Sequence, residues 1–183
     1  MRPVATRTTL AQTLFSAHKC GSIHVPGFGP MQAPGSENLF TQVRIRSFEP
    51  PRDQLKCRQI YASVRAATFS WISPKRFKES DFAPDIVGET LLVADDAANG
   101  IVGFIGIWMP ENFIHHLYVL PAFHRVGIGR ALLETALGII SRPAKLKCQM
   151  ANKNACQFYR HLGWREGEQG FDDIGRWVEF ILD

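Results

Sequence analysis

Hydrophobic and polar residues alternate in several short stretches of the chain, a pattern typical of strands with one buried face. Apolar residues alternate with arginines in 43–48 and with Lys and Gln in 145–150, whereas 90–94 and 101–108 are almost continuously apolar. Asn99-Gly100 separates the latter two stretches and predicts a tight hairpin turn. The predicted strands cover residues 43–48, 90–94, 101–108, 113–120, 145–150, 164–169 and 177–182.

Apolar residues recur at helical spacing in three further segments. The first is Pro51–Thr68, in which Pro51 suits the first helical position and Asp53 suits the positive end of the helix dipole. The second is 128–140, which Pro143 ends, and the third is 155–162. Strands and helices in this order predict an α/β fold in which helices cover a mixed sheet.

The length of 183 residues and the hydrophobic share of 45% fit one folded domain, which we expect to span residues 43–183. Residues 1–42 show no persistent period and predict an N-terminal extension. Three origins stay open for it: a transit-like peptide, an arm that packs on the domain, or a remnant of cloning. The last is considered because Gly35–Leu39 resembles part of a protease-site tag.

The charge distribution and the cysteine content reduce the number of possible functions. The first 36 residues hold Arg2, Arg7 and Lys19 and no acidic residue, so most of the net charge of +4 arises there. The rest of the chain is nearly neutral, which does not favour nucleic-acid binding. No apolar run approaches the ~20 residues of a membrane-spanning helix, so no membrane role is expected. Four cysteines without a Cys-x-x-Cys pair predict reduced thiols, no metal site and a cytoplasmic location.

The strongest chemical signal is a glycine-rich turn, His124–Arg130, between a predicted strand and a predicted helix. Gly127 and Gly129 allow a ligand to approach backbone N–H groups at the positive end of the helix, an arrangement that binds phosphate. A plain strand-to-helix turn is the alternative. A dinucleotide-binding turn is rejected, because Leu132 stands where its third glycine would be.

Two blocks of the chain resemble motifs of the GCN5-related N-acetyltransferases (GNAT). Leu117–Pro121 followed by Arg125–Leu133 resembles the acetyl-CoA motif of that family, and Asn152–Trp164 resembles its later strand-helix segment. With the order of elements from Val43 to Leu182, the resemblance implies the GNAT acyl-CoA N-acyltransferase fold, whose central sheet is mostly antiparallel and flanked by helices.

The resemblance also implies an enzyme, an acetyl-CoA-dependent N-acetyltransferase. In such an enzyme the primary amine of a small molecule or a protein attacks the thioester directly, with acetyl-CoA as cosubstrate and no metal. A non-catalytic acyl-CoA-binding regulatory module is the alternative. The acceptor and the oligomeric state, a homodimer included, stay open.

The resemblance assigns the cofactor to the turn, to the strand before it and to the later helix. Backbone N–H groups of the turn hold the diphosphate, the strand backbone joins the pantetheine arm, and Asn152 orients the cofactor or caps its helix. His124 departs from the family, which has Gln or Arg at this position. The predicted cofactor-binding residues are Leu117, Tyr118, Val119, His124, Arg125, Val126, Gly127, Ile128, Gly129, Arg130, Asn152, Ala155 and Phe158.

Acetyl transfer to an amine needs a neutral amine, a stabilised oxyanion and a proton for the leaving thiolate. The resemblance places the acid at Tyr159, although its helical spacing also fits a core residue. His115 is the favoured base, directly or through water, with Glu111 and His116 behind it. Neighbours on a strand face opposite sides, so at most one histidine would face the acetyl group, and both also fit buried hydrogen bonding. The aromatic segment 69–82 either shapes the acceptor pocket or buries its own rings.

Overall fold

The structure, a computed structural model, describes residues 43–183. The predicted extension, 1–42, lies outside the described residues. The strands are β1 (Val43–Ser47), β2 (Thr90–Asp96), β3 (Gly100–Trp108), β4 (Phe113–Val119), β5 (Ala144–Gln149), β6 (Arg165–Phe171) and β7 (Arg176–Leu182). The α-helices are α1 (Gln54–Thr68), α2 (Phe82–Asp85), α3 (Ile128–Leu137) and α4 (Lys153–His161).

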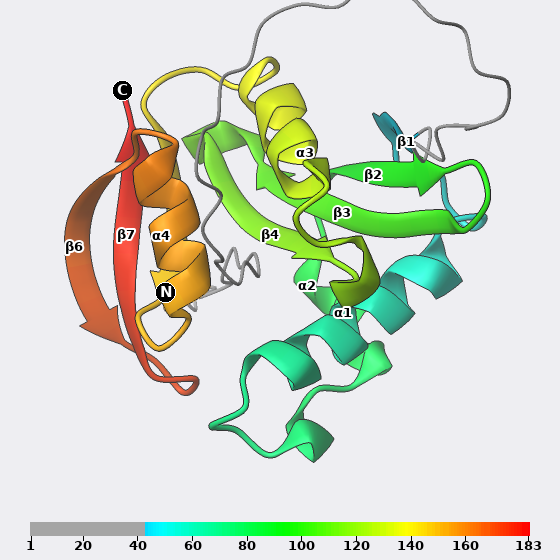
Figure 1. Cartoon of the computed structure of the whole chain (residues 1–183), viewed down its shortest axis with the longest axis horizontal. Helices are drawn as coiled ribbons and strands as arrows, with labels where there is room; N and C mark the ends of the chain where they lie inside the picture. Colours follow the sequence, from blue (N-terminus) through cyan, green and yellow to red (C-terminus); the bar gives the residue numbers. More distant parts are fainter. Residues whose placement is uncertain (1–42) are drawn as a thin grey trace, which may run out of the picture.

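The strands form one seven-stranded sheet in the order β1-β2-β3-β4-β5-β7-β6 (Figure 1). Neighbouring strands are antiparallel except β4 and β5, which are parallel. Each of the seven predicted strands and three predicted helices is present, with ends shifted by a few residues. The predicted α/β fold, with a mostly antiparallel sheet flanked by helices, is therefore confirmed.

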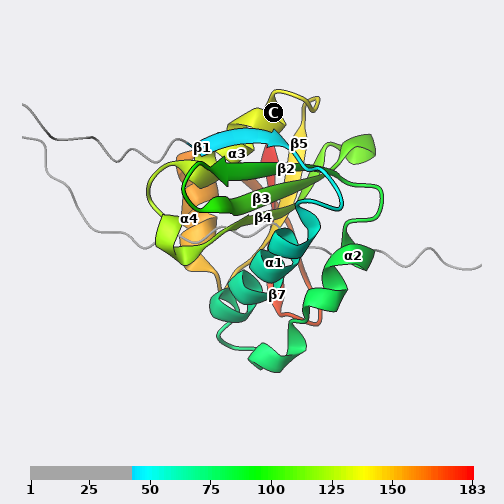
Figure 2. The same ribbon diagram turned by 90° about the vertical axis from the view of Figure 1, so that its right-hand side faces the viewer.

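Helices cover both faces of the sheet (Figures 1 and 2). On one face, α3 and α4 contribute residues such as Leu132 and Ala155 to a buried cluster with the sheet. On the other face, α1 and α2 contribute Ile60 and Phe82 to a second cluster. Because both of its faces are covered, β3 is buried from Ile101 to Ile107, which explains its almost continuous apolar sequence.

Two helix ends differ from the prediction. α1 begins at Gln54 rather than at Pro51, because the Asp53 carboxylate accepts hydrogen bonds from Arg46 of β1 (2.6 Å) and from the N–H of Glu49 (2.8 Å). These contacts hold residues 49–53 in a turn. α3 ends at Leu137 rather than near Pro143, and the N–H of the next residue, a glycine, closes the last helical turn.

Two irregularities of β4 shape the centre of the sheet. The pairing of β4 with β3 shifts between Gly106–His116 and Ile107–Ile114, so His115 is an extra residue in a β-bulge. The pairing of β4 with β5 is limited to two positions, at Phe113 and Ile114. Beyond Ile114 the two strands have no ladder, and the sheet opens between them toward the glycine-rich turn.

Candidate functional site

The glycine-rich turn joins the end of β4 to the start of α3. Arg125 (φ 65°) and Gly127 (φ 89°) are both left-handed. The first bond of α3 runs from the N–H of Ala131 to the carbonyl of Gly127 (2.9 Å), so the N–H groups of 128–130 have no acceptor within the helix. A methyl group added at Gly127 would meet no atom within 4 Å. The turn therefore combines helix N–H groups that have no acceptor in the helix with open space beside Gly127, the geometry of an anion site.

The side chains around the turn complete its surroundings. Arg125 and Arg130 are exposed, and Arg130 pairs with Glu134 one helical turn away (2.7 Å). Nε2 of His124 donates a hydrogen bond to the carbonyl of Val119 at 2.8 Å. This bond fixes the turn against the end of β4, so the histidine that departs from the family pattern has a structural task here.

The three residues of β4 next to the turn are deeply buried. Leu117, Tyr118 and Val119 have side chains no more than 3% exposed, and burial raises the pKa of Tyr118 to about 12. Their side chains belong to the cores on the two faces, so what this segment presents to the opening between β4 and β5 is its backbone.

α4 lies across that opening from α3 (Figure 1). Asn152 is its N-cap: Oδ1 accepts a hydrogen bond from the N–H of Ala155 at 3.2 Å. The Nδ2 amide of the same side chain is buried and has no hydrogen-bond partner among the described residues. Buried amides seldom stay unpaired, so this group is available to a ligand while its oxygen caps the helix.

Tyr159 lies three residues beyond Cys156 on the buried face of α4. Its ring is fully buried and contacts the rings of Phe158, Trp164 and Phe180 at centroid distances of 5.3, 5.8 and 5.4 Å. The ring is therefore a core residue, as the helical spacing of Tyr159 allowed. A role as the catalytic acid would depend on its hydroxyl group alone.

On the opposite face of the sheet, the two histidines of β4 lie beside one carboxylate, and only His115 is hydrogen-bonded to it. Nδ1 of His115 donates to Oε1 of Glu89 at 2.5 Å, and Nε2 of His116 lies 3.6 Å from Oε2 of the same residue. The expectation that the histidines face opposite sides is wrong, because the bulge at His115 interrupts the alternation of side chains.

Glu89 is a site residue that the sequence did not reveal. It directly precedes β2, and its side chain is only 2% exposed. Gly106 of β3 makes room for it: a Cβ at this position would collide with the Glu89 carboxylate and with His116. The only local signal is a carboxylate before an apolar strand, which does not indicate that it reaches β4.

His116 is enclosed by aromatic rings and fully buried. The rings of Tyr61 and Tyr118 lie 5.7 and 5.8 Å from its own. Burial, with smaller effects of His115 and Arg65, holds the pKa of His116 well below its ordinary value, so the ring is neutral near pH 7. His115 remains 13% exposed and is the more accessible of the two.

Two other predicted features lie apart from this cluster. Glu111 sits in a 3-10 turn before β4, exposed and outside the strand, so β4 does not carry it into line with His115. In the aromatic segment, Phe69 and Phe77 pack with Ile174 in a small core, while Trp71 is 39% exposed. The segment thus buries most of its own rings.

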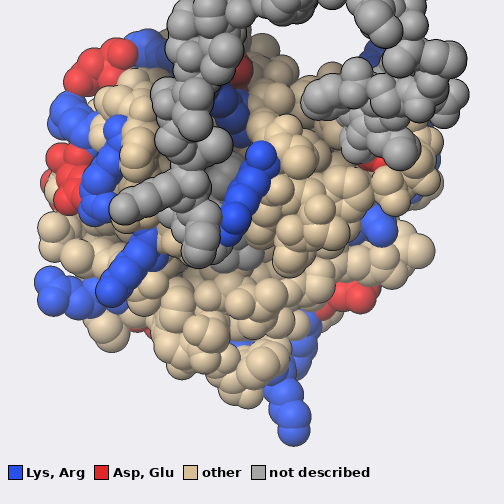
Figure 3. Space-filling model, in the orientation of Figure 1, with Lys and Arg blue, Asp and Glu red and all other residues tan. Residues whose placement is uncertain are grey.

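Within residues 43–183, no group of three or more His, Cys, Asp or Glu side chains is placed to hold a metal ion. In the same part of the chain, no helix has the length and apolar character to cross a membrane. On the face seen in Figure 3, basic side chains lie beside acidic ones near α4 and β6, where Arg160 pairs with Glu166 and Arg165 with Asp183.

The segment that holds these residues matches a known protein family. Residues 87–166, which include Glu89, β4, the turn and α4, match the family model "Acetyltransferase (GNAT) domain". No curated protein sequence matches the chain.

Solved structures share its fold. Apo-form YjaB from Escherichia coli has 20% identity and a TM-score of 0.63, over 76% of this chain and 96% of that one. A GCN5-related N-acetyltransferase from Kribbella flavida has 14% identity and a TM-score of 0.61, over 76% and 96%. Arabidopsis thaliana NAA60, solved in complex with acetyl-CoA, has 16% identity and a TM-score of 0.59, over 77% and 98%.

Proposed function

We propose that this chain is a member of the GNAT acetyltransferase family and that it transfers the acetyl group of acetyl-CoA to a primary amine by direct attack of the amine on the thioester. The observation that carries the proposal is the left-handed turn at Gly127, which has open space beside it and is followed by helix N–H groups without acceptors in the helix, at the end of β4 where its ladder with β5 has stopped. A diphosphate joined to a long flexible arm fits such a site. The N–H groups of the turn would bind the phosphates, and the arm would lie between β4 and β5.

The residues present fit acetyl-CoA on polar groups as well as on shape. The N–H groups of 128–130 and the Nδ2 amide of Asn152 are donors without acceptors in the described structure. Arg125 and Arg130 add positive charge beside the turn. We assign the diphosphate to the turn, the pantetheine arm to the backbone of 117–119, and the amide of Asn152 to a polar group of the same arm.

The catalytic groups come from the two faces of the sheet. His115, a residue of β4, faces the side of the sheet covered by α1, where the Glu89 carboxylate accepts a hydrogen bond from its Nδ1, so its basic lone pair is on Nε2. This nitrogen takes the proton of the attacking amine, directly or through water. Tyr159, from the α4 face, protonates the leaving thiolate through its phenol hydroxyl, a group that can act as a general acid.

His116 is assigned a different task from His115. It is neutral, fully buried and surrounded by rings, which makes it a packing residue that supports the bulge rather than a base. Glu89 is a positioning residue, since it acts through the imidazole of His115 and not on the substrate.

The test measures release of free CoA by the full chain with acetyl-CoA and a panel of primary amines: polyamines, amino acids and peptides. Alcohols of matching shape control for transfer to oxygen. Release with at least one amine and with no alcohol supports the proposal. A protein that is thermally stabilised by acetyl-CoA yet releases no CoA with any acceptor would be a regulatory module instead.

A variant then tests the acid. Tyr159→Phe keeps the ring contacts, so we expect unchanged acetyl-CoA affinity and a turnover lower by about 10²-fold or more. Phe180→Leu is the matched control: it loosens the same ring cluster and leaves the hydroxyl in place. Equal turnover losses in the two variants would assign Tyr159 to the core alone.

A further inference from the structure

Two buried thiols face each other on neighbouring elements, away from the histidine cluster. Cys148 lies on β5 and Cys156 in the first turns of α4, and their sulfur atoms are 3.6 Å apart. Both are reduced. A disulfide needs a sulfur–sulfur distance of about 2.05 Å, so an approach of roughly 1.5 Å would join them.

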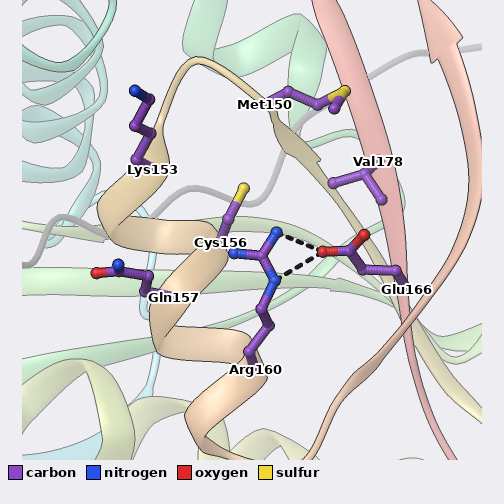
Figure 4. Close-up of a pocket in the computed structure, with 7 residues that line it drawn as sticks. All are labelled: Met150, Lys153, Cys156, Gln157, Arg160, Glu166 and Val178. Atoms are coloured by element: carbon purple, nitrogen blue, oxygen red, sulfur yellow. Dashed lines mark hydrogen bonds and ion pairs between the residues drawn. The ribbon is translucent and has the colours of Figure 1, made fainter.

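Only one of the two thiols borders open space. Cys156 lines a cavity of about 180 Å³ between α4 and the strands β6 and β7 (Figure 4). Arg160, held by Glu166, lies beside it, and Lys153 and Met150 lie at the rim. Cys148 is fully buried behind Cys156. A small reagent therefore reaches Cys156 first and Cys148 only through it.

The surroundings of the two thiols shift their pKa values in opposite directions. The hydrogen bond with Cys148, and to a smaller extent the charge of Arg160, lowers the pKa of Cys156 although burial opposes this. Burial, with the neighbouring Cys156, raises the pKa of Cys148. The thiolate therefore forms more readily at Cys156 than at Cys148. Cys57, in the other core, is fully buried, and burial raises its pKa to about 12.

We propose that Cys156 and Cys148 form a redox modification site that reacts with a small hydroperoxide and closes into a disulfide. The Cys156 thiolate attacks the terminal oxygen of the hydroperoxide: an S–O bond forms, the O–O bond breaks, and the alkoxide or hydroxide leaves and takes a proton. Cys156 is now a sulfenic acid. The Cys148 sulfur attacks it, an S–S bond forms, and water leaves with the Cys148 proton. Two thiols are oxidised and one peroxide is reduced.

The disulfide would act on the helix that carries the proposed acid. Cys156 is bonded through its N–H to the carbonyl of Asn152 (3.1 Å), and Tyr159 follows one turn later. A disulfide would draw α4 toward β5 and so move Asn152 and Tyr159 relative to the opening between β4 and β5. This consequence rests on the proposed function, whereas formation of the disulfide does not.

The experiment treats the folded full chain with hydrogen peroxide in a Cys20→Ser background, which removes the cysteine outside the described residues. Peptide mass spectrometry after alkylation reads each thiol. We expect a Cys148–Cys156 disulfide that forms at least about tenfold faster than Cys57 is modified. Cys57→Ser is the matched control and should leave the disulfide yield unchanged. In Cys148→Ser, a sulfenic acid at Cys156 should be trapped by dimedone.

The outcomes separate the two proposals. Cys156 unmodified while the protein is folded, or Cys57 oxidised at the same rate, would overturn the redox site. A disulfide that forms and is reversed by dithiothreitol supports it even where no acetyl transfer is found. Where transfer is found, turnover that changes on oxidation and returns on reduction supports the coupling through α4, and turnover unaffected by the disulfide contradicts that coupling.

Discussion

Replacing Gly127 by alanine tests the anion site directly. The residue is left-handed, with φ 89°, and an added Cβ meets no protein atom within 4 Å. The substitution therefore causes no collision inside the protein. Its two effects are backbone strain, since L-residues disfavour this conformation, and obstruction of whatever occupies the space in front of the turn.

The two effects differ in size and in what they change. The left-handed conformation costs about 1–2 kcal/mol in the unfolding free energy, whatever the ligand. A methyl group in the site would displace a phosphate oxygen from about one charge-assisted N–H bond, worth about 1.5–3 kcal/mol. That loss corresponds to acetyl-CoA affinity lower by about 10- to 150-fold, because every 1.4 kcal/mol is a factor of ten.

A second glycine of the chain isolates the strain. Gly100, in the β2–β3 hairpin, has φ 69° and equally open space around an added methyl group, so Gly100→Ala carries the strain without the obstruction. Calorimetric titration with acetyl-CoA, alongside thermal unfolding of both variants, gives the comparison. Similar stability losses with an affinity loss only at Gly127 are expected. Equal acetyl-CoA affinities in both variants and the wild type would refute the placement of the diphosphate.

Three further outcomes follow from the ionised and buried groups. Glu89→Gln should lower kcat by about tenfold or more with little change in the KM for acetyl-CoA, and a change in KM alone would contradict its action through His115. Unfolding free energy should fall as the pH drops below ~6.5, by up to about 1.4 kcal/mol per pH unit, because unfolded chains protonate His116 and folded ones do not; denaturant titrations should show a flatter profile in His116→Asn. Asp53→Ala leaves Arg46, 14% exposed, without one of its two carboxylates and should cost about 3 kcal/mol, which thermal unfolding measures.

The parts of the fold that sequence predicted are those set by local patterns. Alternation located strands such as β1, and Asn99-Gly100 located the hairpin, because these signals depend on residues that are neighbours in the chain. The turn around Gly127 is equally local: two glycines between a strand and a helix imply helix N–H groups near the backbone bend. Helix ends were less accurate, since the start of α1 depends on Arg46 from another element.

The cluster of His115, His116 and Glu89 depends on contacts between residues far apart in the chain, which a local sequence pattern does not reveal. Strict alternation separates His115 from His116, and only the register shift against Gly106 places both beside one carboxylate. That carboxylate, Glu89, is 26 residues away from His115 in the chain. The glycine is the residue that links these facts, because any side chain there would occupy the space of the carboxylate. Gly106→Ala should therefore reproduce the kinetic defect of Glu89→Gln while every proposed catalytic side chain is still present; turnover as in the wild type would show that the Glu89–His115 contact does not matter for the reaction.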